Sequence, residues 1–277
     1  MSQPENEKFS LPGVKHVITV ASGKGGVGKS TVAANLALAL LAEGHACGLL
    51  DADIYGPSVG IVMGVAEDTK PEIQGEMLVP VTAHGLQCMS MSFLASDRTP
   101  AVWRGPMAAG ALQQLLTQTI WQDIEYLVVD MPPGTGDIQL TLAQRVPIDG
   151  AIVVTTPQDI ALLDARKGIE MFRRVEVPVL GIVENMSTHI CSSCGHEEAI
   201  FGTDGGEKIA REYGTKLLTQ LPLSLSVREQ IDAGKPTLVA EPEADVSQMF
   251  RHLARQVVES ITVSGASAGP RITVVDD

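Results

Sequence analysis

The chain is 277 residues long, 44% hydrophobic and only 4% aromatic, and it carries a formal net charge of −13 at pH 7. A chain of this length can bury a full core, and aliphatic residues with few aromatic ones suit parallel strands covered by helices. The acidic charge repels phosphate backbones, which disfavours general binding to nucleic acids. No apolar run reaches the roughly 18 residues that a membrane-spanning helix needs.

The two ends of the chain differ from the rest in composition. Residues 1–13 are polar and lack the apolar stretch of a signal peptide, so we expect a flexible leader and a cytoplasmic location. Residues 264–277 are rich in Gly, Ser and Ala and predict a disordered tail. One folded domain over residues 14–263 is therefore expected between them.

Apolar β-branched runs alternate with helical patterns along the chain. The apolar runs predict buried strands at residues 16–22, 46–52, 126–131, 151–156, 179–185 and 217–223. Helices are expected at residues 30–42, 107–119, 159–174, 226–233 and 245–260. Between residues 71 and 91, Gly75 and Gly85 separate short runs that predict a hairpin or an irregular insertion. This alternation predicts an α/β fold with a mostly parallel, doubly wound sheet and helices on both faces.

The first predicted strand leads into a glycine-rich loop. Residues 23–30, GKGGVGKS, fit the P-loop pattern G-x-x-x-x-G-K-[ST] without a mismatch. In a P-loop the backbone N–H groups point at phosphate oxygens, Lys29 reaches the β- and γ-phosphates, and the Ser30 hydroxyl binds Mg²⁺. Thr31 follows at the helix N-terminus, where anions are favoured. The predicted nucleotide-binding residues are Gly23, Lys24, Gly25, Gly26, Val27, Gly28, Lys29, Ser30 and Thr31.

Lys24 is a second lysine inside this loop, at a position where the pattern accepts almost any residue. A cation there can stabilise charge that develops on the transferred phosphoryl group, much as an arginine finger does. The loop resembles the deviant Walker A loop of the MinD/ParA/nitrogenase-iron-protein class of ATPases. That resemblance implies that Lys24 reaches across a homodimer to the nucleotide of the partner chain. A solvated surface lysine is the alternative.

Three aspartates follow predicted strands close to where this loop should lie. Asp130 ends an apolar strand in DMPPGTGD, which is the Walker B arrangement, and we predict that it holds Mg²⁺ directly or through water. Asp51 is expected to support the same metal site from behind, and Asp53 to orient the attacking water as a catalytic residue beside Lys24 and Lys29. A turn or helix-cap role is the alternative for each aspartate.

Cys191 and Cys194 form a C-x-x-C pair after the strand predicted at 179–185. This spacing lets two thiolates face one metal, but tetrahedral zinc or a cubane cluster needs about four ligands. His189 and His196 can supply the missing ligands in a zinc knuckle, or a second chain can supply them across a twofold axis. A dithiol redox pair is a further alternative, although no thioredoxin-like pattern surrounds the cysteines.

Several motifs taken together resemble those of one family, the Mrp/ApbC iron–sulfur cluster carriers. They are SGKGGVGKS, DADIYGPS, VWRGPM, DMPPGTGDIQLTL, TTPQDIAL, VENMS and CSSCG, and the likeness runs from about Val14 to about Glu259. The resemblance implies a homodimer, slow ATP hydrolysis, and a labile [4Fe–4S] cluster bridged by Cys191 and Cys194 of both chains. It also implies that Asn185 contacts adenine. Many bacterial members carry an extra N-terminal domain of about a hundred residues, and a separate partner protein could supply such a domain here.

We therefore expect a P-loop ATPase that uses ATP and Mg²⁺, receives a [4Fe–4S] cluster from a donor protein and transfers it to apo iron–sulfur proteins. A MinD/ParA-like regulatory ATPase with a structural zinc site is the alternative. Such proteins bind membrane or DNA through an amphipathic C-terminal helix or a basic face. The end of this chain, GASAGPRITVVDD, is neither, so we expect neither nucleic acid nor membrane as a partner.

Overall fold

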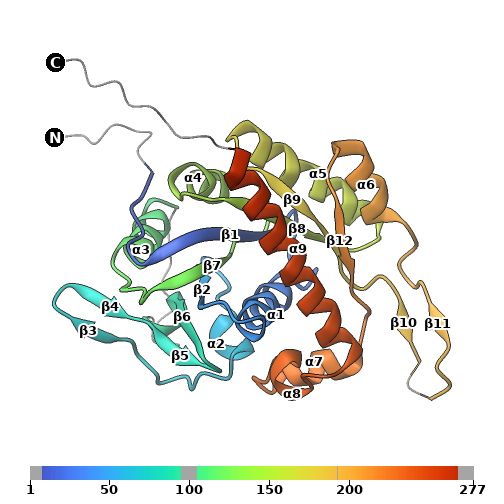
Figure 1. Cartoon of the computed structure of the whole chain (residues 1–277), viewed down its shortest axis with the longest axis horizontal. Helices are drawn as coiled ribbons and strands as arrows, with labels where there is room; N and C mark the ends of the chain where they lie inside the picture. Colours follow the sequence, from blue (N-terminus) through green and yellow to red (C-terminus); the bar gives the residue numbers. More distant parts are fainter. Residues whose placement is uncertain (1–7, 95–104, 192, 268–277) are drawn as a thin grey trace.

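The computed structural model describes residues 8–94, 105–191 and 193–267, and an eight-stranded sheet forms its centre (Figure 1). The strand order is β12-β9-β8-β1-β7-β2-β6-β5, and all neighbours are parallel except the edge pair β5 and β6. These strands are β1 (Val14–Ser22), β2 (Cys47–Asp51), β5 (Val81–Ala83), β6 (Leu86–Ser90), β7 (Ile124–Asp130), β8 (Gly150–Thr155), β9 (Val179–Glu184) and β12 (Leu217–Gln220). The predicted mostly parallel α/β fold is confirmed.

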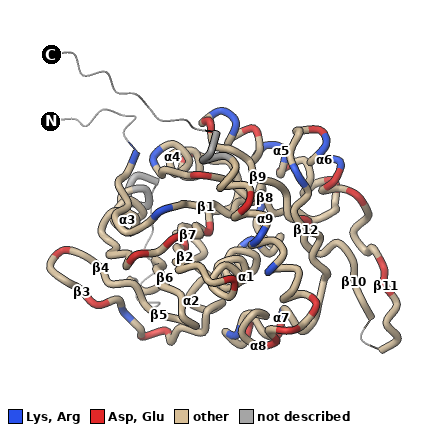
Figure 2. Tube along the Cα trace, viewed as in Figure 1, with Lys and Arg blue, Asp and Glu red and all other residues tan. Residues whose placement is uncertain are grey.

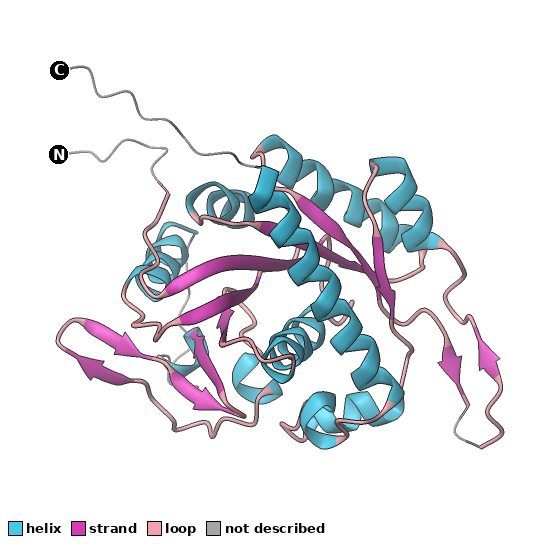
Figure 3. Ribbon diagram, viewed as in Figure 1, coloured by secondary structure: helices cyan, strands magenta, loops and turns pink. Residues whose placement is uncertain are grey.

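Helices cover both faces of the sheet (Figure 3). One layer contains α1 (Lys29–Ala42), α2 (Val59–Val62), α7 (Leu225–Asp232), α8 (Thr237–Ala240) and α9 (Asp245–Ser267). The other contains α3 (Gly105–Thr117), α4 (Asp137–Arg145), α5 (Asp159–Arg174) and α6 (Gly205–Tyr213). Right-handed crossovers run in opposite directions from β1 to β2 and from β6 to β12, which places their helices on opposite faces. The strand order therefore changes direction beside β1. In open α/β sheets, ligands bind at the carboxyl ends of the strands next to such a change of direction.

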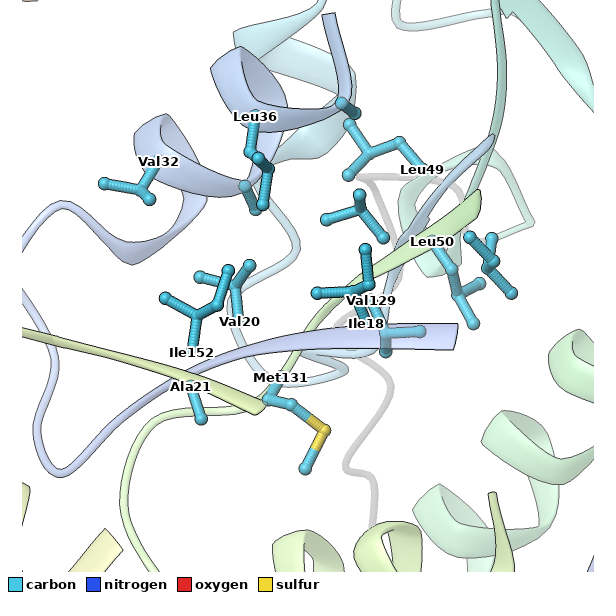
Figure 4. Close-up of a cluster of buried hydrophobic side chains, with 14 of the residues drawn as sticks. Ile18, Val20, Ala21, Val32, Leu36, Leu49, Leu50, Val129, Met131 and Ile152 are labelled. Carbon is cyan, nitrogen blue, oxygen red and sulfur yellow. The ribbon is translucent and has the colours of Figure 1, made fainter. Parts of the chain in front are cut away.

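One part of the core lies between the central strands and helix α1 (Figure 4), and the core continues on the other face with Leu115, Leu142 and Phe172. Consecutive residues of β1, β2, β7 and β8 are buried, because helices cover both faces of these strands. Helix α1 is itself covered by α9, so all of its residues from Val32 to Leu40 are buried. The buried side chains labelled in Figure 4 are Ile18, Val20, Ala21, Val32, Leu36, Leu49, Leu50, Val129, Met131 and Ile152.

The region between residues 71 and 91 is more regular than its sequence suggested. Strands β3 (Glu72–Gln74) and β4 (Met77–Val79) form a separate hairpin, but β6 joins the main sheet beside β2. Cys88 and Met89 are fully buried there. The sequence of β6, LQCMS, is short and partly polar. Its pattern therefore does not distinguish a strand of the central sheet from a strand of a peripheral hairpin. Its place in the sheet depends on pairing with β2.

Part of the predicted leader packs against the domain, and part of the predicted tail is helical. The Phe9 N–H donates to the Arg145 carbonyl oxygen at 2.7 Å, and the Arg145 guanidinium lies 4.9 Å from the centre of the Phe9 ring. Helix α9 continues to Ser267, past the boundary expected at residue 263. Residues 1–7 and 268–277 and the start of the VWRGPM motif lie outside the described residues. Within the described ranges, none of the helices has the length and apolar character that crossing a membrane requires.

Candidate functional site

The phosphate-binding loop joins β1 to α1 at the carboxyl edge of the sheet, and its glycines are needed for two physical reasons. Gly26 and Gly28 have φ angles of +81° and +84°, which L side chains rarely adopt. A Cβ atom on Gly28 would overlap the Asn185 amide, and one on Gly23 would overlap the Asp164 backbone of α5. The loop is therefore held between α5 on one side and the end of β9 on the other.

Lys29 is the first residue of α1, and its ammonium forms a buried ion pair with Asp130 at the end of β7. The same ammonium lies 3.4 Å from the Ser30 hydroxyl. Asp130 is completely buried, and its Oδ2 atom has no hydrogen-bond partner among residues 8–94, 105–191 and 193–267. A buried carboxylate oxygen without a donor, close to a serine hydroxyl, fits the oxygen ligands that Mg²⁺ requires.

Asp51 lies beside Asp130 in the sheet, because the two residues are register partners of the parallel strands β2 and β7. Its side chain is also completely buried. Four groups donate hydrogen bonds to its carboxylate at 2.9 to 3.1 Å, namely Asp53 N–H, Ser58 N–H, Val59 N–H and the Ser90 hydroxyl. With both oxygens occupied by donors, the Asp51 carboxylate holds the loop of residues 52–59 beside Asp130.

The two buried aspartates make this edge of the sheet strongly acidic. Burial, followed by repulsion from Asp130, raises the pKa of Asp51 to about 7, while backbone N–H donors oppose the shift. Burial also raises the pKa of Asp130, and the Lys29 ammonium and the Ser30 hydroxyl oppose that change. One lysine thus faces two buried carboxylates, and a divalent cation would compensate the remaining negative charge.

The structure places both other predicted catalytic residues at this edge. Asp53 is half-buried, accepts a hydrogen bond from the Gly56 N–H at 3.2 Å, and lies close enough to Asp130 to raise its pKa. The Lys24 carbonyl accepts a hydrogen bond from Ser22, but the Lys24 ammonium has no hydrogen-bond or ion-pair partner in the described part of the chain. The charge of Lys24 is therefore available to a group outside its own chain or to a nucleotide.

A cavity of about 270 Å³ opens beside the loop, next to Gly28 and Thr31. Its walls come from the end of β9, the segment after β12, and helices α7 and α9, and they include Asn185, Met186, Leu221, Pro222, Val227 and Ile231. Asn185 lies at the junction, since its side-chain N–H donates to the Val27 carbonyl oxygen at 2.9 Å. A mostly apolar slot beside a phosphate loop is suited to a heterocyclic base. Of the lining residues, Gly28, Thr31 and Asn185 were predicted from the sequence, whereas those of the segment after β12 and of α7 and α9 were not.

The cysteine pair lies on a short hairpin that projects from the body beyond β9 and β12 (Figure 1). Its strands are β10 (His189–Ile190) and β11 (Glu197–Glu198), and Figure 2 shows no Lys or Arg on it. The Cys191 N–H donates to the His196 carbonyl oxygen at 2.9 Å, and the Gly195 N–H donates to the Cys191 carbonyl oxygen at 2.8 Å. These bonds close the turn and keep both cysteines on one loop.

Both cysteines are accessible, since Cys194 is exposed and Cys191 is partly exposed. Hydrogen bonds from the backbone N–H groups of Ser193 and Cys194 to the Cys191 sulfur lower the pKa of Cys191. A lowered pKa favours the thiolate, which is the form that binds metal. The hairpin therefore offers a pair of sulfur ligands on an open surface.

The single-chain zinc knuckle is not supported by the hairpin geometry. The ring of His189 donates from Nδ1 to the Leu223 carbonyl oxygen at 3.3 Å, which directs it to the segment after β12. In the ranges that the structure describes, no group of three or more His, Cys, Asp or Glu side chains is arranged to hold a metal ion. Among the described residues, His189 and His196 are therefore not brought together with Cys191 and Cys194 as the ligands of one zinc ion.

Comparisons with known proteins identify the family of this chain. The family model described as "ParA: NUBPL iron-transfer P-loop NTPase" matches residues 13–258. An iron-sulfur cluster carrier protein of Pseudomonas fragi is 60% identical over 255 residues, which cover 91% of this chain and 89% of that protein. The iron-sulfur cluster transfer protein NUBPL of Mus musculus is 49% identical and covers 95% of this chain and 83% of its own length.

A solved structure with clear sequence similarity also shares the fold. The nucleotide-binding protein of Archaeoglobus fulgidus, in complex with ADP, superimposes with a TM-score of 0.75 at 36% identity and covers 87% of this chain and 93% of its own. The predicted resemblance is confirmed, whereas the alternative of a regulatory ATPase with structural zinc is not supported by these relatives. The chain belongs to the ParA family, in the group of the NUBPL iron-transfer P-loop NTPases.

Proposed function

We propose that this protein is an ATP-hydrolysing carrier of iron–sulfur clusters and that a labile [4Fe–4S] cluster is its cargo. The observation that carries the proposal is the accessible pair Cys191 and Cys194, with a lowered pKa for Cys191, in a chain with a complete phosphate-binding loop. Similar proteins named iron-sulfur cluster carriers support it. Donor proteins and apo iron–sulfur proteins in the cytoplasm are the proposed partners.

For hydrolysis, the loop amides and Lys29 hold the phosphates, and Asn185 contacts the base in the adjoining cavity. Ser30 and Asp130 hold Mg²⁺, which neutralises phosphate charge when it is bound. Asp53 orients the attacking water, since its carboxylate accepts only one hydrogen bond, from Gly56, within the described residues.

Two chains together complete both sites in this proposal. Each chain offers one pair of sulfur ligands, so two chains related by a twofold axis supply the four ligands of a cubane cluster. The unpartnered Lys24 ammonium has the same need for a second chain, where it stabilises the charge on the transferred phosphoryl group. We therefore propose a homodimer with slow turnover coupled to cluster transfer.

Anaerobic reconstitution with iron and sulfide tests this function. The wild type should take up roughly one [4Fe–4S] cluster per two chains, with visible thiolate-to-iron absorbance. Cys191→Ser/Cys194→Ser should take up none, whereas Ser193→Ala, on the same loop, should load normally. In isolated heterodimers of one wild-type and one doubly substituted chain, only two cysteines remain, so little stable cluster should form. One tightly held zinc ion per chain would instead favour a structural metal site.

A further inference from the structure

The nucleotide cavity and the cysteine hairpin are joined by one stretch of paired backbone. The parallel pairing of β9 and β12 continues past the ends of both strands. The Ser187 N–H and hydroxyl both donate to the Leu221 carbonyl oxygen, at 2.9 and 3.0 Å, and the Leu223 N–H donates to the Thr188 carbonyl oxygen at 2.7 Å. His189 and Leu223 form the last bridge of this pairing. Residues 187–189 are therefore held against residues 221–223.

The segment 221–223 separates two cavities. On one side, Leu221, Pro222 and Leu223 line the cavity of about 270 Å³ beside the phosphate loop. Pro222 also lines a second cavity of about 320 Å³, whose other walls include Ile190 and Glu197 of the cysteine hairpin. A ligand that fills the first cavity therefore contacts a wall that also faces the hairpin.

The end of this connection that lies next to the sheet, at Glu184 and Leu221, is held by the domain. The Leu221 N–H donates to the Glu184 carbonyl oxygen at 2.9 Å. The buried Glu184 side chain accepts hydrogen bonds from the Gly206 N–H at 2.6 Å and the Gln220 amide at 2.8 Å. The opposite end is the exposed cysteine hairpin, whose two strands have two residues each. If residues 221–223 are displaced, the well-anchored residues around Glu184 resist the movement, whereas the weakly packed cysteine hairpin can follow it.

The His189 side chain connects the cysteine hairpin to the segment 221–223. Its ring donates from Nδ1 to the Leu223 carbonyl oxygen at 3.3 Å, and it lies two residues before Cys191. Between Asn185 at the base cavity and His189, the chain bends at Met186, which has a φ angle of +56°. A non-glycine residue with this angle is uncommon and persists only where its surroundings hold it. The bend is held by the same pairing with residues 221–223.

We propose that the segment 221–223 couples nucleotide occupancy to the position of the cysteine pair, and that His189 is the positioning residue of this coupling. The inference rests on the proposed function and adds its regulation. A base in the cavity contacts one side of the segment, and His189 transmits the change in the segment to Cys191. Because such coupling is reciprocal, a bound cluster changes nucleotide affinity by the same factor as nucleotide changes cluster affinity.

Hydrogen exchange on the metal-free protein tests the coupling without any cluster. Adding ADP with Mg²⁺ should slow amide exchange across residues 187–198 of the wild type. In His189→Ala, nucleotide affinity should stay within about twofold, but the slowing in the hairpin should shrink by about fivefold, the factor of a hydrogen bond worth about 1 kcal/mol. His196→Ala is the matched control, since its exposed ring makes no hydrogen bond to residues 221–223 in the described ranges.

Two results would overturn the coupling. One is a wild type that binds ADP with no change in hairpin exchange, and the other is a His189→Ala variant that keeps the full change. A melting curve of each variant verifies that it is folded. In cluster-loaded protein, ADP should change the cluster release rate of the wild type and of His196→Ala, and change that of His189→Ala by about fivefold less. If no variant loads a cluster, the proposed function fails, while the exchange experiment still decides the coupling.

Discussion

The Lys29–Asp130 ion pair at the start of α1 is buried, whereas Cys194 at the tip of the β10–β11 hairpin is exposed to solvent. Around the ion pair, close contacts of Gly23 and Gly28 with the neighbouring backbone and side chains leave the loop little freedom. Around the cysteines, two-residue strands and a few backbone hydrogen bonds hold a small loop. Phosphoryl transfer depends on fixed charges, while a cargo that is passed on must be reachable.

The comparison predicts that substitutions at the phosphate loop affect both stability and turnover, and the largest effect is expected at Lys29. Lys29→Met should reduce ATP hydrolysis by about a thousandfold or more, because the cation that meets the phosphates is lost. It should also destabilise the fold by about 3 kcal/mol, because Asp130 is left buried without its partner. Phosphate release and denaturant unfolding measure the two effects.

A second substitution separates the two roles of Lys29. Lys29→Met/Asp130→Asn removes both members of the ion pair, so most of the lost stability should return while hydrolysis stays absent. If the double variant is no more stable than Lys29→Met, the buried charge is not the cause of the instability.

Asp53→Asn should have the next largest effect, confined to turnover. If this carboxylate orients the attacking water as proposed, its loss should slow hydrolysis by about 10²-fold or more, with nucleotide affinity kept, because the proposed Mg²⁺ ligands Ser30 and Asp130 remain. Single-turnover hydrolysis and equilibrium nucleotide binding measure the two quantities. Undiminished turnover would assign the role to another acid.

Lys24→Ala should slow hydrolysis by about 10²-fold while ATP binding and stability stay nearly unchanged. Its ammonium has no partner in the described part of its own chain, so little intrachain interaction is lost. Mixed with Asp53→Asn chains, Lys24→Ala chains should regain part of their activity if Lys24 acts across the dimer, because one site of a mixed dimer is then intact. A loss of nucleotide affinity equal to that of Lys29→Met would contradict this division between the two lysines.

The same contrast explains what could be predicted from the sequence. The strand ending at Ser22, the loop and the Cys191–Cys194 pair are local patterns, so spacing and residue type were sufficient to find them. The hairpin expected at Gly85 is present as β5 and β6, but the place of β6 in the main sheet was missed. Helices α4 and α6 were also missed, because their short or weakly apolar sequences depend on tertiary packing.

The wall of the base cavity was missed for a related reason. Residues 221–224 and helix α7 carry no ligand-binding motif, and no residue of α7 is fully buried. They become part of a site only because the segment after β12 pairs with the segment after β9. Such a contact between residues far apart in the chain is not visible in local periodicity.

The smallest effect on stability is expected at the hairpin. Cys191→Ser/Cys194→Ser should change the unfolding free energy of the metal-free protein by less than about 0.5 kcal/mol, because exposed substitutions remove little packing. ATP binding should also be unchanged, since the loop contacts of Asn185 lie outside the hairpin. Cys88→Ser, on the buried strand β6, is the matched contrast and should cost about 1–3 kcal/mol, because it places a hydroxyl in an apolar core. Denaturant unfolding without metal compares the two. If Cys191→Ser/Cys194→Ser lowers the unfolding free energy as much as Cys88→Ser does, the hairpin contributes to the stability of the folded core. The contrast drawn between the hairpin and the phosphate loop is then wrong.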